Sequence, residues 1–378
     1  MKKIQIVFLL CFVPYVHFAQ QGCTDPNATN YLATATYNDG SCTYASTNYS
    51  LTSVATLPSQ LNEISGMVHY NGKIYGHQDS GGPTALYEVD PATGSITKTI
   101  TLVGVTNVDW EDMTQDDTHF YIADVGNNSN GNRTDLKFYK FAKALITAGA
   151  TVSIPNASIE VINFSYEDQT NFTATGGNNT EFDCEAVAFN RGKLHLFTKN
   201  WIGTTTVHYV LPTTAGTHSA ERLDSFDIGT YKITGAAVGA FDLLILIGYE
   251  TSGSANCALF LDFGFDGTYS YLGTGAKRRL DLGSAAIIGQ VEGICFVNAL
   301  HGYASNERFT YTIPFIGSTT IDQQLYTFNI MSYIQAYYEH NQVTFSTTAV
   351  PPSAGTIRFN ATTNVLEGYD GTHWNPFH

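Results

Sequence analysis

The stretch Val108–Gly126, VDWEDMTQDDTHFYIADVG, sets the pattern on which the fold prediction depends. It opens with acidic residues, continues as a short strand-like run, turns through polar residues, and ends as a second apolar strand at Asp124. Two strand-like runs separated by a short polar turn are typical of an antiparallel β-hairpin. The stretch therefore predicts a hairpin that carries carboxyl groups where its first strand begins.

Four further stretches share this plan, namely Glu63–Asp79, Asp183–Asn200, Ile233–Glu250 and Val291–Glu307. A third strand-like run follows each hairpin, and a fourth follows most of them, with a period of about fifty residues. Four antiparallel strands per repeat are the signature of a β-propeller blade. We therefore predict an all-β chain in which residues 46–345 form a five-bladed β-propeller. The fifth repeat lacks an obvious fourth strand, and we expect Ser50–Leu57 to supply it and to close the ring.

The composition agrees with an exported all-β protein. Only 13% of the 378 residues are charged, another 13% are aromatic, and the formal net charge is −15. No stretch gathers Lys and Arg, so binding to nucleic acid through phosphate contacts is not expected. The negative charge is compatible with cation binding and also with simple solubility.

The first twenty residues have the features of a secretory signal peptide. Two lysines follow Met1, an apolar run covers Ile4–Val13, and a cleavage point lies near Ala19 or Gln20. No other apolar run is long enough to span a bilayer, so we predict no membrane span and a secreted or cell-surface location.

Five cysteines remain after the signal peptide, and two of them bracket a short segment. We expect Cys23 and Cys42 to form a disulfide in residues 21–45, and Cys184, Cys257 and Cys295 to be buried thiols. The segment, QGCTDPNATNYLATATYNDGSCTY, resembles a Cys-bounded GCTDP…DGSC module of secreted bacterial surface proteins. The resemblance implies an exported surface protein. A plain disulfide knot and a calcium site both remain open for it.

The C-terminal part, residues 346–378, reads as a linker followed by a β-hairpin. Proline and small residues dominate 347–355, and Thr356–Trp374 contains two strand-like runs around a polar turn. This segment resembles a short hairpin near the ends of phage tail-fibre and bacterial surface proteins. The resemblance implies a trimerisation, attachment or packing element, with a packed terminal hairpin as the alternative.

Propeller geometry predicts where the polar residues of the repeats gather. The start of the first strand of a blade lies beside the end of the second, so both sets of residues should converge on one mouth of the central channel. Four glutamates at the strand starts are candidate metal ligands: Glu63, Glu111, Glu185 and Glu292. The other candidates at this mouth are Asp79, Asp109, Trp110, Asp124, Asp183, Lys199, Asn200, Glu250, Asn306 and Arg308.

Four glutamates in a narrow channel repel one another unless a cation or bound water relieves the repulsion, or unless some of them hold protons. Ligands that are all oxygen favour a hard cation, Ca²⁺ before Mg²⁺. The alternative role of these glutamates is structural hydrogen bonding at the strand ends.

The stretches Glu63–Asp79, Glu111–Ala123 and Val291–Phe296 resemble repeats of the calcium-activated nucleotidase (apyrase) family, and the Glu-Gly-Ile pattern is also similar to phytase-like esterase propellers. The nucleotidases are five-bladed propellers whose inner strands begin with Glu or Ser around a central calcium. The resemblance implies Ca²⁺ as cofactor, Glu63, Glu111, Glu185 and Glu292 as its ligands, and Thr234 at the fifth position, without a carboxylate.

Two functional hypotheses follow. The first is a binding or interaction protein whose acidic channel holds Ca²⁺ and whose partner is a surface or a small-molecule ligand. The second is a calcium-dependent hydrolase of phosphate esters or related esters, in which Glu111 or Asp109 activates water. Basic residues near the predicted mouth are few (Arg133, Lys199 and Arg308), and no nucleophile–base pair is evident. These features favour the first hypothesis, and we assign no catalytic residue.

Overall fold

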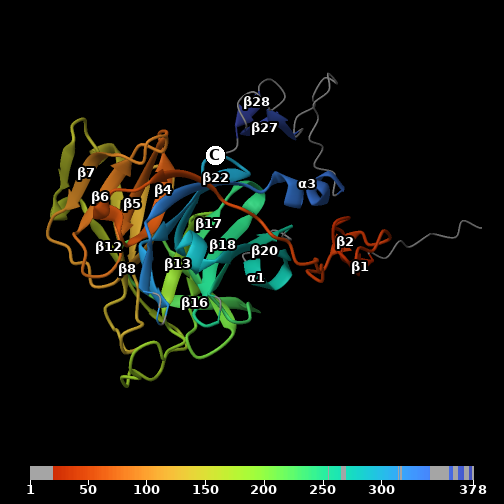
Figure 1. Cartoon of the computed structure of the whole chain (residues 1–378), viewed down its shortest axis with the longest axis horizontal. Helices are drawn as coiled ribbons and strands as arrows, with labels where there is room; N and C mark the ends of the chain where they lie inside the picture. The colour runs from red at the N-terminus through yellow and green to blue at the C-terminus, as the bar shows by residue number, and fades with distance from the viewer. Residues whose placement is uncertain are drawn as a thin grey trace, which may run out of the picture.

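The computed structural model describes residues 20–253, 255–264, 270–313, 315, 317–340, 357–360, 365–369 and 374–376. Strands dominate it, and its helices are short, as Figure 1 shows. The prediction of an all-β propeller chain is confirmed in this respect. Among the described residues, no helix has the length and apolar character needed to cross a membrane.

Twenty of the strands form five antiparallel groups of four. The first three groups, each in order from its innermost strand, are β4 (Ile64–Tyr70), β5 (Lys73–Gln78), β6 (Ala85–Val89) and β7 (Ile96–Leu102); β8 (Trp110–Gln115), β9 (His119–Asp124), β10 (Lys137–Ala142) and β12 (Glu160–Tyr166); and β13 (Cys184–Asn190), β14 (Lys193–Thr198), β15 (Thr205–Pro212) and β16 (Gly216–Asp227). The last two groups are β17 (Tyr231–Val238), β18 (Leu244–Glu250), β19 (Asn256–Phe263) and β20 (Ala276–Ser284); and β21 (Gln290–Phe296), β22 (His301–Glu307), β25 (Gln324–Asn329) and β3 (Thr52–Thr56).

The closing strand is found where the sequence predicts it. Strand β3 pairs antiparallel with β25, so the N-terminal part of the chain completes the last group. Two further pairings join the outer edges: β11 (Thr151–Ile154) runs parallel to β7, and β12 runs parallel to β16. These pairings cover strand edges that would otherwise be exposed.

The innermost strands form a closed ring. Strand β4 contacts β8, β8 contacts β13, β13 contacts β17, β17 contacts β21, and β21 returns to β4. A register irregularity interrupts the pairing near the start of every one of these five strands. Gly235 lies at such a point, where a methyl group would overlap the Glu292 carbonyl oxygen of the next strand. The ring therefore brings the five strand starts to one face.

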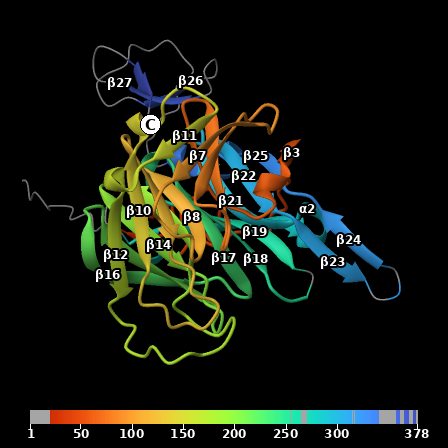
Figure 2. The ribbon, with the colours of Figure 1, turned by 90° about the vertical axis from the view of Figure 1, so that its left-hand side faces the viewer.

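The remaining elements connect these groups or lie at the ends of the chain. The short helices are η1 (Ser59–Leu61), η2 (Lys143–Leu145), η3 (Asn156–Ser158), η4 (Ala240–Asp242), α1 (Tyr271–Thr274), α2 (Ala285–Ile288) and α3 (Met331–His340). A hairpin of β23 (Phe309–Ile313) and β24 (Gly317–Ile321), which the sequence analysis does not predict, lies between β22 and β25 and projects from the body in Figure 2.

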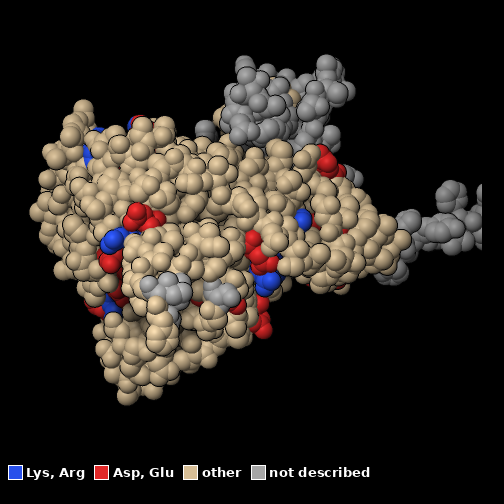
Figure 3. Space-filling view, viewed as in Figure 1, with Lys and Arg blue, Asp and Glu red and all other residues tan. Residues whose placement is uncertain are grey.

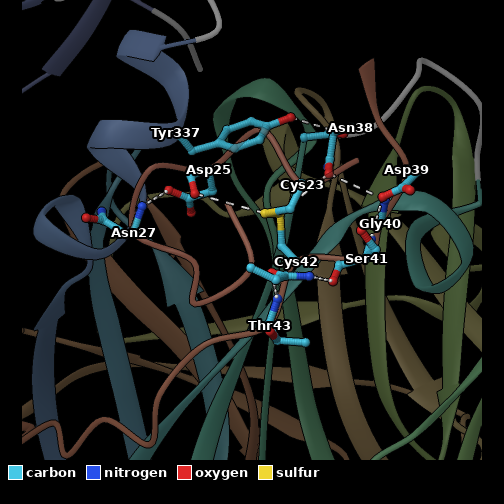
Figure 4. Close-up of a disulfide and its surroundings, with 12 residues drawn as sticks. Cys23, Asp25, Asn27, Asn38, Asp39, Gly40, Ser41, Cys42, Thr43 and Tyr337 are labelled. Atoms are coloured by element: carbon cyan, nitrogen blue, oxygen red, sulfur yellow. Dashed lines mark hydrogen bonds between the residues drawn. A yellow bond between two sulfur atoms is a disulfide. The ribbon is translucent and has the colours of Figure 1, made fainter. Parts of the chain in front are cut away.

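The predicted disulfide is confirmed. Cys23 and Cys42 are bonded between β1 (Gln21–Gly22) and the end of the module, and β1 pairs with β2 (Tyr37–Asn38). Figure 4 shows this disulfide with the residues around it. Asp25 accepts hydrogen bonds from Asn27 N (2.8 Å) and Tyr44 Oη (2.7 Å). This use of its oxygens within the module favours the disulfide knot over the calcium alternative.

Helix α3 covers this module and the fourth strand group, since Tyr31 Oη lies 3.3 Å from His340 Nε2 and the Tyr337 ring stacks edge-on against Phe263. The three other cysteines are buried free thiols, as predicted.

The predicted ends of the chain are only partly covered. The signal peptide, apart from Gln20, and the predicted linker, 347–355, lie outside the described residues. In the C-terminal part, β26 (Ile357–Asn360) pairs antiparallel with β27 (Val365–Tyr369), as the hairpin prediction requires, and β27 pairs with β28 (Trp374–Pro376). The division into four parts at residues 20, 45 and 345 stays a prediction.

A buried polar chain runs across three strands of the third group, on the side where α1 packs. His195 Nδ1 lies 2.9 Å from His208 Nε2, and His208 Nδ1 lies 2.9 Å from Asp224 Oδ1. The ring of Tyr271 from α1 packs edge-on against His195 at a centroid distance of 5.1 Å. Burial and the neighbouring His208 lower the pKa of His195 to about 3. His195 is therefore neutral in the folded protein at pH values where the unfolded chain protonates it.

This pKa shift predicts an acid-dependent loss of stability. Because the folded-state pKa lies below the ordinary value of 6.5, the unfolded state binds more protons between these two values, and stability falls as the pH falls from about 6.5 towards 3. We expect His195→Phe to flatten the pH dependence of the free energy of unfolding, measured by urea denaturation, over this window. Parallel curves for the variant and the wild type would contradict the assignment.

Candidate acidic site at the mouth of the ring

Five carboxyl groups meet at the starts of β8 and β13. Asp79, Asp109 and Glu111 form one set of three, and Glu111, Asp183 and Glu185 form a second. Within each set, one oxygen of every residue lies within 4.8 Å of the others. Glu111 belongs to both sets and is 3% exposed, and Asp183 is fully buried. The site is therefore one continuous cluster with Glu111 at its centre.

The same backbone hydrogen bond positions the cluster in three groups. Asp79 N donates to Glu63 O (3.0 Å), Val125 N to Asp109 O (3.1 Å) and Lys199 N to Asp183 O (2.8 Å). Asp109 and Asp183 therefore lie at an outer level of the ring, and Glu111 and Glu185 lie two residues further along their strands, at an inner level. Because residues two apart on a strand lie on the same face, the side chains of both levels can point into the same space.

The register corrects the predicted position of Glu63. Ile64 pairs with Gln78 as Trp110 pairs with Asp124, so Ser65 is the residue level with Glu111, and Glu63 is level with Asp109. Glu63 is exposed and outside both sets of the cluster, whereas Ser65 is buried and its hydroxyl donates to the Glu111 carbonyl oxygen.

Glu292 and Thr234 occupy the remaining inner positions. Glu292 is buried but belongs to neither set of three, and the charges that act on it most strongly are those of Glu307 and Lys199. Thr234 Oγ1 donates to the Val291 carbonyl oxygen (2.7 Å) and so ties β17 to β21. Of the four predicted glutamates, the structure brings together Glu111 and Glu185.

One lysine neutralises one side of the cluster. Lys199 is buried and forms an ion pair with Glu185. Its ammonium group also lies over the rings of Trp201 (4.9 Å) and Tyr249 (5.3 Å). Burial opposes the charge, but the Glu185 carboxylate raises the pKa of Lys199 well above its ordinary value. Lys199 is thus a fixed cation of this site.

Asp183 is held by two donors. Asn127 N donates to its Oδ1 (2.6 Å) and Trp201 Nε1 donates to its Oδ2 (2.7 Å). Trp201 therefore has a polar role at the mouth and contacts Lys199 as well. The loop after β9 supplies Asn127, so this loop fixes one edge of the cluster.

The other edge has carboxyl oxygens that lack partners. Glu111 Oε1 is buried and has no hydrogen-bond partner in the described part of the chain. Gly126 lies directly against it, and a methyl group there would overlap both Glu111 Oε1 and Asp109 Oδ2. Arg133 fixes this loop, since it donates to Gly126 O (2.8 Å) and Asp124 Oδ1 (2.8 Å). The backbone at Gly126 thus packs closely against the unpaired Glu111 oxygen and the Asp109 carboxyl group.

Crowding of these acids perturbs their ionisation. Burial, and then the charges of Asp79 and Asp183, raise the pKa of Asp109 to about 7. Burial and the Glu185 charge raise the pKa of Glu111 well above its ordinary value. Without a cation the cluster must therefore hold protons at neutral pH. The ligand atoms that the cluster offers to a metal are all carboxylate oxygens, which suit a hard divalent ion.

The other predicted mouth residues have structural partners. Trp110 is fully buried and donates to Thr106 O (3.0 Å), so it is a core residue rather than a ligand-stacking one. Asn200 Oδ1 accepts from Gly203 N (2.9 Å) and shapes a turn. Glu250 accepts from Asn256 Nδ2 (2.7 Å).

The last two candidates lie in the fifth group. Asn306 Nδ2 donates to Glu307 O (2.7 Å) and to Asp322 O (3.1 Å), and Arg308 is exposed, 3.5 Å from Asp322. Neither residue belongs to the carboxylate cluster.

Asp112 has a role that the sequence did not assign to it. It is 1% exposed and accepts hydrogen bonds from Met113 N (2.7 Å), Val187 N (2.9 Å) and Ala236 N (3.3 Å). One carboxyl group therefore connects three inner strands across the channel. The signal available in the sequence was its place directly after Glu111. In the structure the strand register is irregular at this point, so that two consecutive residues point inward.

Comparisons with known proteins leave the function open. No protein-family model matches the chain, and no curated protein matches it. Similar solved structures include a PQQ-bound aldose sugar dehydrogenase from Streptomyces coelicolor (9% identity, 74% of this chain, 97% of that chain, TM-score 0.40) and an α-L-arabinanase from Penicillium chrysogenum complexed with arabinobiose (8%, 75%, 99%, 0.40). Another is the calcium-binding protein regucalcin from Agrobacterium tumefaciens (10%, 74%, 97%, 0.37). Likenesses this distant say nothing about activity.

The Lys199–Glu185 pair yields a stability prediction. Removal of one partner of a buried ion pair leaves an unpaired charge, so Lys199→Met should lower the free energy of unfolding by about 3–5 kcal/mol in the presence of a chelator. The double variant Lys199→Met/Glu185→Gln should recover most of this loss. The surface pair Lys140–Glu160 (2.9 Å) is the control, and Lys140→Met should cost less than about 1 kcal/mol. Equal costs for the two lysines would contradict the pairing.

Proposed function

We propose that the chain is an exported five-bladed β-propeller that binds a divalent cation, Ca²⁺, in the carboxylate cluster and binds its ligand at the same mouth. The observation that carries this proposal is Glu111 Oε1, a buried carboxyl oxygen at the centre of five acids that finds no partner in the described part of the chain. A buried carboxylate is costly unless it is paired, protonated or bound to a metal.

The charges favour a cation. Five carboxyl groups share the site with Lys199, which already pairs with Glu185. Asp79, Asp109 and Glu111 thus form the half that a cation would neutralise, and their oxygens match the ligand type of Ca²⁺. The inner level of the ring, which carries Glu or a hydroxyl residue on every strand, also supports the resemblance to propellers whose inner strands begin with Glu or Ser.

The basic groups near the mouth argue against a ligand with several phosphates. Arg133 is bound to Asp124 and to Gly126 O, Lys199 to Glu185, and Lys232 Nζ to the carbonyl oxygens of Asn200 and Gly203. These three groups are already engaged within the protein, and the exposed Arg308 lies 3.5 Å from Asp322. We therefore favour a neutral ligand, such as a hydroxylated small molecule or the surface of a partner, which would add its own oxygen atoms to the cation.

A second candidate function is calcium-dependent hydrolysis of an ester. Asp109 favours it, because this carboxyl lies at the outer level of the cluster, where it can accept a proton from a water molecule beside the cation. Bound Ca²⁺ would supply charge that polarises a carbonyl or phosphoryl oxygen. Asp109 would accept the proton of the attacking water, while Glu111, enclosed by Gly126, would remain a ligand.

The cation proposal is tested by thermal unfolding with calcium and with chelator. We expect calcium at about a hundred times its Kd to stabilise the protein by about 2.7 kcal/mol, and Glu111→Gln to abolish this gain. Glu63→Gln is the matched control, since Glu63 is exposed and outside the cluster, and it should retain the gain. An absent calcium effect, or one that persists in Glu111→Gln, would exclude this site.

The hydrolase candidate is tested by turnover. A screen of nitrophenyl esters, lactones and phosphate esters in the presence of calcium should reveal a substrate, and Asp109→Asn should lower kcat by about 10²-fold or more while the calcium-dependent stabilisation remains detectable. Trp110→Phe, a change in the adjacent core, should leave kcat within a few fold. Stabilisation by calcium without any turnover would leave the binding function alone.

A further inference from the structure

A second hollow lies away from the mouth cluster. A cavity of about 350 Å³ lies between the end of β16 and strands β18, β19 and β20, and α1 contributes one wall. It is lined by apolar side chains from both strand groups, namely Phe226, Ile228, Leu246, Phe260 and Leu272. Asp227 and Gly229, which are exposed, form its rim. The cavity therefore has an apolar interior that reaches the surface.

Charged residues also line the cavity: Asp262, Lys277, Arg278 and Arg279, with Asp227 at the rim. Arg278 Nη1 donates to Tyr333 O (2.6 Å) and Arg279 forms an ion pair with Asp281 (2.8 Å), so both arginines are engaged elsewhere. Asp262, at the end of β19, is 3% exposed, and neither of its carboxyl oxygens has a hydrogen-bond partner among the described residues. An unpaired buried carboxyl group of this kind is rare in a folded protein and calls for a partner. The cavity beside it is the space in which a partner can lie.

The nearby lysine does not fill this role. Lys277 Nζ lies 3.9 Å from Asp262 Oδ2, beyond hydrogen-bond distance. The same ammonium group donates to Gly275 O (2.7 Å) and lies over the Phe226 ring at 5.2 Å. Lys277 therefore partly offsets the negative charge of Asp262 but donates no hydrogen bond to its oxygens.

A second carboxyl group increases the negative potential. Asp224 uses Oδ1 for His208, whereas its Oδ2 is buried and also lacks a partner in the described chain. Burial, and then the charge of Asp224, raise the pKa of Asp262 well above its ordinary value, against the influence of Lys277. Lys277 is the basic group that acts on Asp262, so a further cation beside this carboxyl group would favour its ionised form.

We propose that this cavity binds a small organic cation whose ammonium or guanidinium group hydrogen-bonds to Asp262 and whose aromatic or aliphatic body packs against Phe226 and Phe260. The charged end supplies the donors that Asp262 lacks, and the apolar body removes the two rings from water. The ring faces can also attract the cation.

Other ligand classes fit the cavity less well. An anion could pair with Lys277 in the lining but would bring no donor to the Asp262 oxygens. A purely apolar molecule would leave the Asp262 oxygens unpaired, and a neutral alcohol would offer one donor without charge. A metal ion would find at most the two carboxyl groups of Asp262 and Asp224, since no metal-like set of three groups occurs here among the described residues.

The test is calorimetric titration of the full chain, with calcium present, with three probes of similar shape: 2-phenylethylamine, 2-phenylethanol and 3-phenylpropionate. We expect saturable binding of the amine at millimolar concentration or below, and at least about tenfold weaker binding of the alcohol and the acid. Asp262→Asn keeps the shape of the side chain and should weaken amine binding by about tenfold or more.

Three controls decide between outcomes. Asp227→Asn on the exposed rim and Glu63→Gln, which lies outside the mouth cluster, should bind the amine as the wild type does, whereas Leu272→Trp should block the cavity and abolish binding. Thermal unfolding of each variant confirms that it is folded. Equal binding of amine and alcohol, retained binding in Asp262→Asn, or no binding of the amine would each overturn the proposal.

Discussion

Repulsion among buried carboxyl groups is the constraint on which the mouth of this protein depends. The closed ring of inner strands brings Asp109, Glu111, Asp183 and Glu185 into one small space, and burial makes every negative charge there costly. The surrounding residues reduce this free-energy cost for two of the acids. Lys199 pairs with Glu185, and Asp183 accepts hydrogen bonds from the loop after β9 and from Trp201. Glu111 has no such partner for Oε1 in the described residues, so the relief left to it is a proton or a cation.

The strand irregularities explain how one ring can carry both structural and ligand-binding acids. At the start of β8, two consecutive residues point inward, so Glu111 faces the mouth while Asp112 faces the channel and receives three backbone N–H groups. Asp112 has its partners within the protein and ties β8, β13 and β17 together. Glu111 has an oxygen free for a cation. The two neighbouring carboxyl groups therefore differ in role because of their hydrogen bonds, not their chemistry.

Much of the fold could be predicted from the sequence, because each repeat carries its own strand pattern and turns. The closing role of β3 followed from a missing strand, and the disulfide from two isolated cysteines. The site was harder. Glu63 and Ser65 lie two residues apart, hence on the same face of an extended strand, and only the pairing of Ile64 with Gln78 shows that Ser65 is level with Glu111. Asp79 and Asp183 were predicted at the mouth, but their joint approach to Glu111 depends on contacts between blades, which a repeat pattern does not contain.

The asymmetry of the cluster limits where ligand recognition can lie. Lys199 neutralises the Glu185 side and packs against Trp201 and Tyr249, so this side is already compensated and enclosed. The opposite side consists of Asp79, Asp109 and Glu111, with the Gly126 backbone against the carboxyl oxygens. Figure 3 shows only scattered charged side chains on the outer face drawn there, consistent with many of the acids being buried. Under the proposed cation-binding function, the loop between Gly126 and Arg133 borders this side of the cluster, so we expect its side chains to influence specificity.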